Sequence, residues 1–341
     1  MKKICIVTDA WFPQVNGVVT TFKNLVDDLR KDGNTVVVIE PSMFPNFSFP
    51  FYKSIRLAYP KHLSLMIDEF KPDYIHIATE GPIGVAAKIY CIKNGIPHTS
   101  SFHTDFSFFL KKNYFIPRRI TWAYLKTFHW FSESVLVPNS YTVKMLQQNG
   151  FENNIIEWTR GCNKDIFIYK EKKDVFLENV YICVSRVSKE KNLDEFGKLS
   201  KSVNGVFVLI GDGPYLNKMR KKYPDIIYCG SLSQEKIVEW FAKSDVFIFP
   251  SRFDTFGIVM LEALSCGVPV VSYNTGAASS IIVNGKNGYV VNSIEEMTKA
   301  AKMCLGLDRE EVSKSVSSTK YSWQRATKIF LETIVLINGR K

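Results

Sequence analysis

The feature that most constrains the fold of this sequence is a repeated alternation of short apolar runs with longer amphipathic segments. In the first half of the chain the apolar runs are KICIVT near the N-terminus, TVVVIE at 35–40, DYIHIA at 73–78 and SVLVP at 134–138. Each run is almost continuously hydrophobic, which is typical of strands buried on both faces of a parallel sheet. The runs therefore predict a parallel sheet in this half of the chain.

A helix is predicted between the first two strands. Apolar residues recur there at three- and four-residue spacing, and they are Val18, Phe22, Leu25, Val26 and Leu29. Gly33 follows the last of them, where a glycine commonly ends a helix. A strand, a helix and a second strand within about 40 residues form a βαβ unit.

A second series of apolar runs begins near residue 180 with VYICVS, GVFVLIG, DVFIFPS and VPVVSY, separated by helical or polar stretches. The whole chain is therefore predicted to be an α/β protein with two Rossmann-like, doubly wound parallel-sheet domains facing a cleft. We expect the first domain at 1–168 and the second at 169–320. A further helix is predicted near the end of the chain, in SWQRATKIFLETIVL within the segment 321–341.

Length and composition agree with this organisation and exclude several classes. A chain of 341 residues favours two domains over one core. Seven scattered cysteines with no CxxC pair suggest neither a disulfide framework nor a zinc site. The first apolar run is too short for a signal peptide or a membrane span. We therefore expect a cytoplasmic protein. Its net charge of +11, shared between the two halves, favours an anionic partner.

The stretch from 250 to 272, PSRFDTFGIVMLEALSCGVPVVS, carries the clearest chemical signal. A predicted strand ends there in a loop with Asp254 and Gly257, and a helix with Glu262 follows. The N–H groups at a helix N-terminus bind a diphosphate well, and Glu262 can accept hydrogen bonds from ribose hydroxyls. Asp254 can hold a sugar hydroxyl. By pattern alone, a corner with a solvated aspartate and a capping glutamate is equally consistent.

Five further motifs accompany this stretch: TDAWFPQVNGVVTT at 8–21, SFHTDF at 101–106, RGCNKDIF at 160–167, SRVSKEKN at 185–192 and IGDGP at 210–214. Together they resemble family 4 glycosyltransferases of the GT-B fold, in which two acidic residues separated by seven others precede a Gly-x-Pro-Val-Val strand. Here Asp254 replaces the more common glutamate. The resemblance implies a retaining transferase for nucleotide sugars, in particular one similar to GDP-mannose-dependent α-mannosyltransferases and related glycolipid-forming enzymes. It also implies that the C-terminal segment 321–341 packs back on the first domain.

Arg186 and Lys191 follow a predicted strand and lie five residues apart, so both cations can converge on one diphosphate. A solvated basic loop is the structural alternative. The resemblance assigns these two residues to the donor diphosphate. The resemblance also assigns two backbone segments to the donor site. One is the glycine loop of the first domain, Asn16 and Gly17, and the other is the segment Phe256, Gly257 and Ile258.

His103 and Asp105 follow the predicted strand PHTSSF. Such a pair can orient an acceptor hydroxyl or stabilise charge near the transferred sugar, and a core histidine satisfied by its neighbour is the structural alternative. The resemblance favours a catalytic role for His103, together with Asp254. No Asp-x-Asp triplet, complete GxGxxG or GxxxxGK[ST] loop occurs, so we expect no metal and no cofactor beyond the GDP- or UDP-sugar substrate. The IGDGP turn is expected only to end its strand.

The segment from Phe106 to Ser132 has no acidic residue and interleaves aromatic with basic side chains. Ile120, Tyr124, Phe128 and Phe131 are predicted to share one helical face. Domain core and contact with an anionic membrane explain this composition equally well, and nucleic acid is a weaker third explanation. Under the membrane explanation the residues that contact the acceptor or the lipid surface are Asp105, Lys111, Lys112, Arg118 and Arg119.

Together with the resemblance, the sequence favours a cytoplasmic hexosyltransferase, which under the membrane explanation is peripheral on the inner face of the membrane. We expect a nucleotide sugar as donor, a membrane glycolipid or a cell-envelope glycan as acceptor, and no nucleic acid partner. A nucleotide-sugar epimerase of the same fold is an alternative. A non-catalytic, membrane-associated scaffold is the alternative from a different functional class.

Overall fold

The computed structural model describes residues 1–14, 16–49, 52–103, 105, 107, 110–111, 115–173, 175–252, 254–317 and 319–338. The chain forms two compact units. Unit 1 consists of Met1–Arg160 and Trp323–Lys341, and unit 2 consists of Gly161–Ser322. The boundary expected at residue 168 falls inside unit 2, because Cys162 and Phe167 are buried in the hydrophobic core of that unit.

The main sheet of unit 1 is parallel, with the strand order β2-β1-β5-β6-β7-β8 within the described residues. Its strands are β1 (Lys3–Val7), β2 (Thr35–Ile39), β5 (Tyr74–Ile77), β6 (His98–Ser101), β7 (Ser134–Val137) and β8 (Asn154–Glu157). All but β8 are fully or largely buried, which explains why their sequences are almost continuously apolar.

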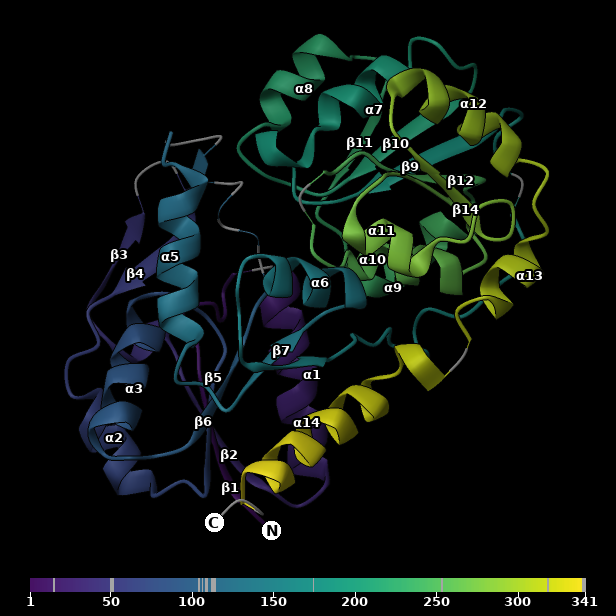
Figure 1. The fold of residues 1–341 in the computed structure, drawn as a ribbon. Helices are drawn as coiled ribbons and strands as arrows, with labels where there is room; N and C mark the ends of the chain where they lie inside the picture. The colour runs from purple at the N-terminus through teal and green to yellow at the C-terminus, as the bar shows by residue number, and fades with distance from the viewer. Residues whose placement is uncertain are drawn as a thin grey trace. The chain divides into compact units, whose positions relative to one another are not determined.

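Helices cover both faces of this sheet (Figure 1). They are α1 (Gly17–Lys31), α2 (Leu63–Phe70), α3 (Pro82–Lys93), α5 (Arg118–His129), α6 (Ser140–Gln148) and α14 (Trp323–Asn338). The strand β5 shows the two layers, because its side chains alternate between them. Ile75 and Ile77 belong to the core cluster under α2 and α3, whereas the His76 ring packs on Phe22 of α1 and Phe330 of α14.

A two-stranded antiparallel hairpin, which the sequence analysis did not predict, follows β2. It consists of β3 (Asn46–Phe49) and β4 (Tyr52–Ala58), after the short 3-10 helix η1 (Pro41–Met43). The hairpin does not extend the main sheet. Ala58 nevertheless joins the unit 1 core cluster near α2 and α3.

The sheet of unit 2 is also parallel, with the order β11-β10-β9-β12-β13-β14. Its strands are β9 (Val180–Val184), β10 (Val206–Ile210), β11 (Ile227–Gly230), β12 (Val246–Phe249), β13 (Val270–Tyr273) and β14 (Gly288–Val291). The chain runs outward from β9 to one edge and then returns to build the other half from β12. The point where the order reverses lies between β9 and β12.

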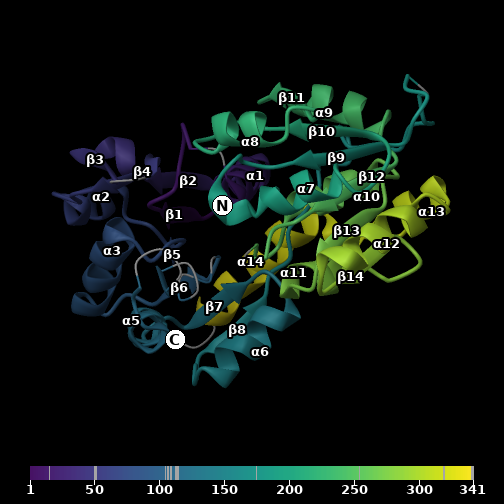
Figure 2. The ribbon, with the colours of Figure 1, turned by 90° about the horizontal axis from the view of Figure 1, so that it is seen from above.

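The helical segments of unit 2 form two layers, one on each face of its sheet (Figure 2). They are η2 (Lys189–Lys191), α7 (Leu193–Leu199), α8 (Leu216–Lys222), α9 (Gln234–Phe241), α10 (Ile258–Ser265), α11 (Gly276–Ile281), α12 (Ile294–Cys304), α13 (Arg309–Lys314) and η3 (Thr319–Tyr321). One core cluster joins the sheet to α9, α10, α11 and α13, and the other joins it to α7, α8 and α12. Two doubly wound α/β units, as predicted from the alternation of apolar runs, are therefore confirmed.

The last helix, α14, packs against α1, the first helix of the chain (Figure 1). The indole Nε1 of Trp158 donates a hydrogen bond of 2.8 Å to the carbonyl oxygen of Ala326, and Phe330 packs on the Trp158 ring. The C-terminal segment thus completes the core of unit 1. Among the described residues no helix combines the length and the hydropathy that a membrane span requires.

Candidate functional site

In unit 2, the predicted donor residues lie in the two loops that flank the reversal of strand order. Arg186 follows β9, and Asp254 follows β12. In open α/β sheets, ligands bind at the carboxyl ends of the strands at this point. The strand order, which the sequence does not show, thus brings together residues 68 positions apart.

The two loops are linked by an ion pair. The Lys191 Nζ donates to Asp254 Oδ1 at 2.6 Å, and both side chains are about one quarter exposed. Next to them, Asn192 adopts a left-handed backbone conformation and its Nδ2 donates to the carbonyl oxygen of Pro250 at 3.2 Å. The predicted diphosphate ligand Lys191 and the predicted sugar ligand Asp254 are therefore in direct contact, with the partly exposed Arg186 in the same loop as Lys191.

Gly257 is required by its backbone conformation. It precedes the first residue of α10 with φ of +74°, and an added Cβ would lie 2.7 Å from the Cε of Met260. The turn starts α10 at Ile258, so the N–H groups of the first turn are available to an anion. The Phe256 side chain is buried in the unit 2 core against the ring of Tyr321, so Phe256 can offer a ligand only its backbone.

Glu262 lies one turn into α10 and is partly exposed. Among the described residues its carboxyl group has no hydrogen bond or ion pair. Burial raises the pKa of Glu262 from its ordinary value of 4.5 to about 7. A partly buried carboxyl group without a protein partner is well suited to accept hydrogen bonds from ligand hydroxyls.

The IGDGP turn does more than end its strand, contrary to expectation. A Cβ on Gly211 would lie 1.9 Å from the carbonyl oxygen of Ser185, and a Cβ on Gly213 would lie 2.4 Å from that of Val187. The Val187 N–H also donates to the carbonyl oxygen of Asp212 at 2.9 Å. The two glycines thus allow this turn to pack directly against the backbone that flanks Arg186.

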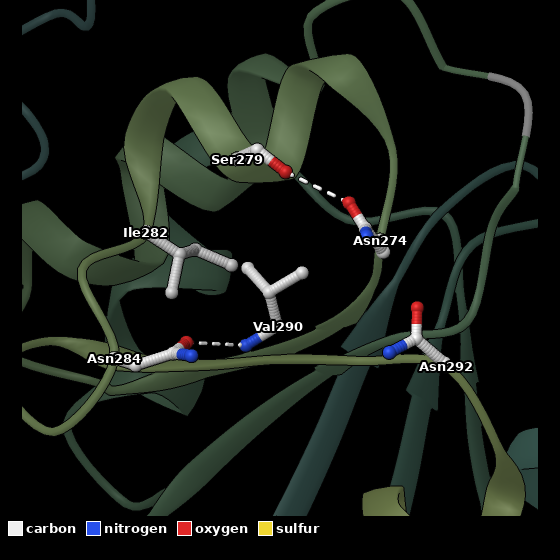
Figure 3. A pocket seen from close by; sticks show the side chains of 6 residues that line it. All are labelled: Asn274, Ser279, Ile282, Asn284, Val290 and Asn292. Atoms are coloured by element: carbon white, nitrogen blue, oxygen red, sulfur yellow. Dashed lines mark hydrogen bonds between the residues drawn. The ribbon is translucent and has the colours of Figure 1, made fainter.

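A pocket in unit 2, of about 450 Å³, lies beside the edge strand β14 (Figure 3). Its lining consists of Asn274, Ser279, Ile282, Asn284, Val290 and Asn292. Two of its asparagines are engaged within the protein, since Asn284 Oδ1 accepts from the Val290 N–H and Asn274 Oδ1 accepts from the Ser279 hydroxyl. None of the predicted donor residues lines this pocket.

In unit 1, the side chain of Asn16 caps α1. Its Oδ1 accepts from the N–H groups of Val18 and Val19, each at 3.0 Å. The side-chain oxygen of Asn16 is therefore engaged within the protein. Gly17, in contrast, is exposed, and a Cβ there would meet no atom within 4 Å, so a ligand can approach its backbone closely.

His103 is buried at the end of β6 and contacts a buried arginine. A guanidinium nitrogen of Arg160 lies 2.9 Å from the His103 Nδ1, and another donates to the carbonyl oxygen of Trp158 at 2.6 Å. Burial and the Arg160 charge hold the pKa of His103 well below its ordinary value of 6.5. His103 is therefore neutral at the pH values at which enzymes normally work.

Three of the predicted acceptor residues lie on or beside α5. The Asp105 Oδ1 accepts from the N–H and hydroxyl of Ser107, and its Oδ2 lies 3.8 Å from a guanidinium nitrogen of Arg118. Arg119 is exposed, as is Lys111 in the preceding segment. Lys112 lies outside the described residues.

The four apolar residues predicted to share one face of α5 are divided by the structure. Phe128 is buried, Ile120 and Tyr124 are about half exposed, and Phe131 lies beyond the end of the helix at His129. The face that enters the core carries Thr121, Trp122, Leu125, Phe128 and His129. Exposed apolar side chains remain around this helix, and they are Phe115, Ile120, Tyr124, Trp130 and Phe131.

Sequence reasoning missed two residues that support the unit 1 site. One is Arg160, whose contact with His103 spans 57 positions. The other is Asp9, whose carboxylate accepts from the N–H groups of Ile83 and Gly84 and from the hydroxyl of Thr79. Arg160 is the first residue of the motif RGCNKDIF, and Asp9 lies in the motif TDAWFPQVNGVVTT. Their place in these motifs was the only sequence feature that could have indicated a function.

Two family models match the chain and together cover most of it. The model for Glycosyltransferase Family 4 matches residues 15–165, and the model for Glycosyl transferases group 1 matches residues 165–322. The boundary between the matches lies close to the boundary between the two units.

Curated relatives and solved structures agree with these matches. A GDP-mannose-dependent alpha-mannosyltransferase of Corynebacterium glutamicum is 26% identical over 321 residues, which span 86% of this chain and 77% of the relative. An alpha-monoglucosyldiacylglycerol synthase of Streptococcus pneumoniae is 24% identical over 322 residues, 82% of this chain and 73% of the relative. The sucrose-phosphate synthase structure from Thermosynechococcus elongatus superposes with a TM-score of 0.81 at 12% identity, over all of both chains.

Proposed function

This chain belongs to the glycosyltransferases of the GT-B fold, with a Family 4 domain followed by a group 1 domain, and from that premise we propose a specific reaction for it. It transfers a hexose from a nucleoside diphosphate sugar to a hydroxyl group of a membrane glycolipid. The observation that carries the proposal is the convergence of Arg186, Lys191, Asp254 and the α10 N-terminus at the strand-order reversal of unit 2.

The donor diphosphate carries charge that increases as its bond to the sugar breaks. Arg186, Lys191 and the N–H groups at the start of α10 supply positive charge and hydrogen-bond donors for it, a function that a metal ion serves in other transferases. We therefore expect transfer to proceed without a divalent metal. Glu262 binds the ribose, and Asp254 binds the sugar after Lys191 turns toward the diphosphate.

GDP-mannose is the donor that we would test first, because the Corynebacterium relative is named for it. In transfer, the bond between the anomeric carbon and the diphosphate oxygen breaks, a bond from that carbon to the acceptor oxygen forms, and the proton of the acceptor hydroxyl passes to the departing diphosphate. We propose that the anomeric configuration is retained, with the acceptor hydroxyl approaching from the face that the diphosphate leaves.

The acceptor is proposed to be a lipid because of the surface around α5. Large apolar side chains are exposed there beside basic ones: Phe115 is 88% exposed, and Arg119 and Lys111 are also exposed. Basic and aromatic side chains together are typical of surfaces that bind anionic bilayers. The pneumococcal relative, whose name describes a glucosylated diacylglycerol, supports a lipid acceptor for this chain.

The donor proposal is tested by release of nucleoside diphosphate from a panel of GDP- and UDP-sugars, with and without vesicles of bacterial lipid extract and with EDTA present. Lys191→Ala is expected to weaken donor binding by at least about tenfold, since it removes a charged hydrogen bond. Lys189→Ala is the matched control, because Lys189 is exposed in the same turn. No release from any donor would refute the transferase and favour the epimerase or the scaffold alternative.

The membrane proposal is tested by co-sedimentation with vesicles that contain anionic lipid. The double variant Lys111→Glu/Arg119→Glu is expected to bind these vesicles at least about 30-fold more weakly, at about 1 kcal/mol for each basic residue lost. The control is Lys299→Glu/Lys302→Glu, which reverses two exposed charges on α12 of unit 2. Equal binding by the two double variants would show that the α5 surface is not the contact.

A further inference from the structure

Arg160 is a buried cation with an unusual set of partners. It is 2% exposed, and no carboxylate contacts its guanidinium among the described residues. Its contacts are the carbonyl oxygen of Trp158, the face of the Trp158 ring at 4.2 Å, and the Nδ1 of His103 at 2.9 Å. Burying a charged guanidinium costs free energy of folding. A buried Arg160 that is held in place without an acidic partner among the described residues therefore suggests a function.

The contact with His103 determines where the imidazole carries its proton. Arginine has only donors, so the Arg160 N–H donates and the His103 Nδ1 accepts. An accepting Nδ1 has no proton of its own, so the proton of the neutral ring is on Nε2. In this state Nε2 can donate a hydrogen bond and cannot accept a proton.

The surroundings of the ring favour the same state. His103 packs edge-on against Phe22 of α1 at 5.3 Å and against Trp158 at 6.3 Å. Among the described residues, the titratable groups whose charge acts on His103 are Arg160, His76 on β5 and His129 on α5, and each disfavours a positive charge on His103. With burial, they lower the pKa of His103, so the neutral ring persists in mildly acidic solution.

We propose that Arg160 is a positioning residue that holds His103 as the neutral Nε2–H tautomer, so that His103 donates a hydrogen bond to an oxygen of the bound sugar. The inference rests on the function proposed above and refines it. His103 then stabilises negative charge on that oxygen or orients it, and it does not remove the proton of the acceptor hydroxyl.

Arg160 is itself held in place by the C-terminal helix. Its guanidinium lies on the Trp158 ring, and the indole N–H of Trp158 donates to the carbonyl oxygen of Ala326 in α14. Three successive contacts, His103 with Arg160, Arg160 with Trp158 and Trp158 with Ala326, thus connect His103 to the C-terminal helix of unit 1.

The first test is nuclear magnetic resonance of the full chain with ¹⁵N-labelled histidine. The chain has five histidines, and His103→Asn identifies the signal of residue 103. We expect the ¹⁵N shifts of a neutral Nε2–H ring that does not titrate between pH 5.5 and 8.5. A protonated Nδ1 or a titration within that range would overturn the proposal. This measurement requires neither turnover nor a folded Arg160 variant.

The second test compares two substitutions of His103. The amide nitrogen of Gln occupies nearly the place of Nε2, whereas that of Asn lies near the place of Nδ1. If His103 acts by donating from Nε2, His103→Gln is expected to keep at least about ten times more activity than His103→Asn. Equal loss in both variants would contradict the donor role.

The third test addresses Arg160 itself. Arg160→Met is expected to lower kcat at least about tenfold, to leave the affinity for nucleoside diphosphate unchanged, and to make His103 titrate. Arg160→Lys, which keeps a donor and a charge, is expected to restore part of kcat and the Nε2–H signature. If the tautomer is as expected but no nucleoside diphosphate is released from any donor sugar, the proposed function fails while the assignment of the tautomer stands.

Discussion

Replacing Glu262 by Gln should stabilise unit 2 while weakening donor binding, and the size of the first effect follows from the burial of the carboxyl group. The pKa of Glu262 is raised from 4.5 to about 7. Below pH 4.5 the group is protonated in the folded and in the unfolded chain. Between pH 4.5 and about 7 only the unfolded chain loses the proton, so stability falls as the pH rises.

Above pH 7 the folded protein carries the full cost of the buried charge. A tenfold change in a protonation constant corresponds to 1.36 kcal/mol, so the raised pKa of Glu262 corresponds to about 3 kcal/mol at pH 8. Part of this side chain reaches solvent, which reduces the cost. We therefore expect Glu262→Gln to raise the free energy of unfolding of unit 2 by about 1–3 kcal/mol at pH 8 and by almost nothing at pH 4.5.

The assay is urea unfolding of the full chain at both pH values, with hydrogen exchange of the α10 amides reporting on unit 2. Glu178→Gln is the control, since Glu178 is exposed in the same unit. In parallel, nucleoside diphosphate binding should weaken at least about tenfold in Glu262→Gln, because a charged hydrogen-bond acceptor for the ribose is lost. A stability gain of the same size at both pH values would refute the argument from burial.

Further substitutions test contacts that hold the backbone near the predicted site residues of each unit. Gly211→Ala is expected to destabilise unit 2 by about 3 kcal/mol in urea unfolding, because its Cβ would overlap the carbonyl oxygen of Ser185. The control is Gly95→Ala. Gly95 also has a positive φ, of +62°, but its Cβ would meet no atom within 4 Å, so this change should lower the free energy of unfolding by only about 1 kcal/mol. Asp9→Ala should destabilise unit 1 by about 2 kcal/mol in thermal unfolding, because the N-terminal turn of α3 loses its carboxylate acceptor. The surface variant Asp27→Ala, which removes only an exposed pair with a lysine, should change stability by less than about 0.5 kcal/mol.

The strands and their parallel arrangement could be predicted because they are buried on both faces, so that burial appears directly in the sequence. Gly33 was expected at the end of α1, and it follows the cap residue Asp32 with a left-handed φ of +80°. The hairpin of β3 and β4 was missed because it lies outside the parallel sheets and lacks a long apolar run.

Candidate site residues could be predicted from the sequence where they lie close together along the chain. Asp254, Gly257 and Glu262 are close in sequence, and the spacing of a strand, a loop and a helix brings them together. The contact of Arg160 with His103 joins two distant points of the chain, and no local pattern records such a pairing. Phe131 was wrongly assigned to the face of α5 because the sequence does not show that the helix ends at His129.

The route of the chain through its two units determines when each can fold during synthesis. Unit 2 is one continuous stretch, Gly161–Ser322, whereas unit 1 is completed by residues from Trp323 onward. The ribosome therefore delivers all of unit 2 before it delivers α14, whose Phe330 is fully buried against β5 and Trp158. Unit 1 is therefore begun first and completed last. Until α14 is synthesised, the part of the sheet face that Phe330 covers stays exposed in the nascent polypeptide.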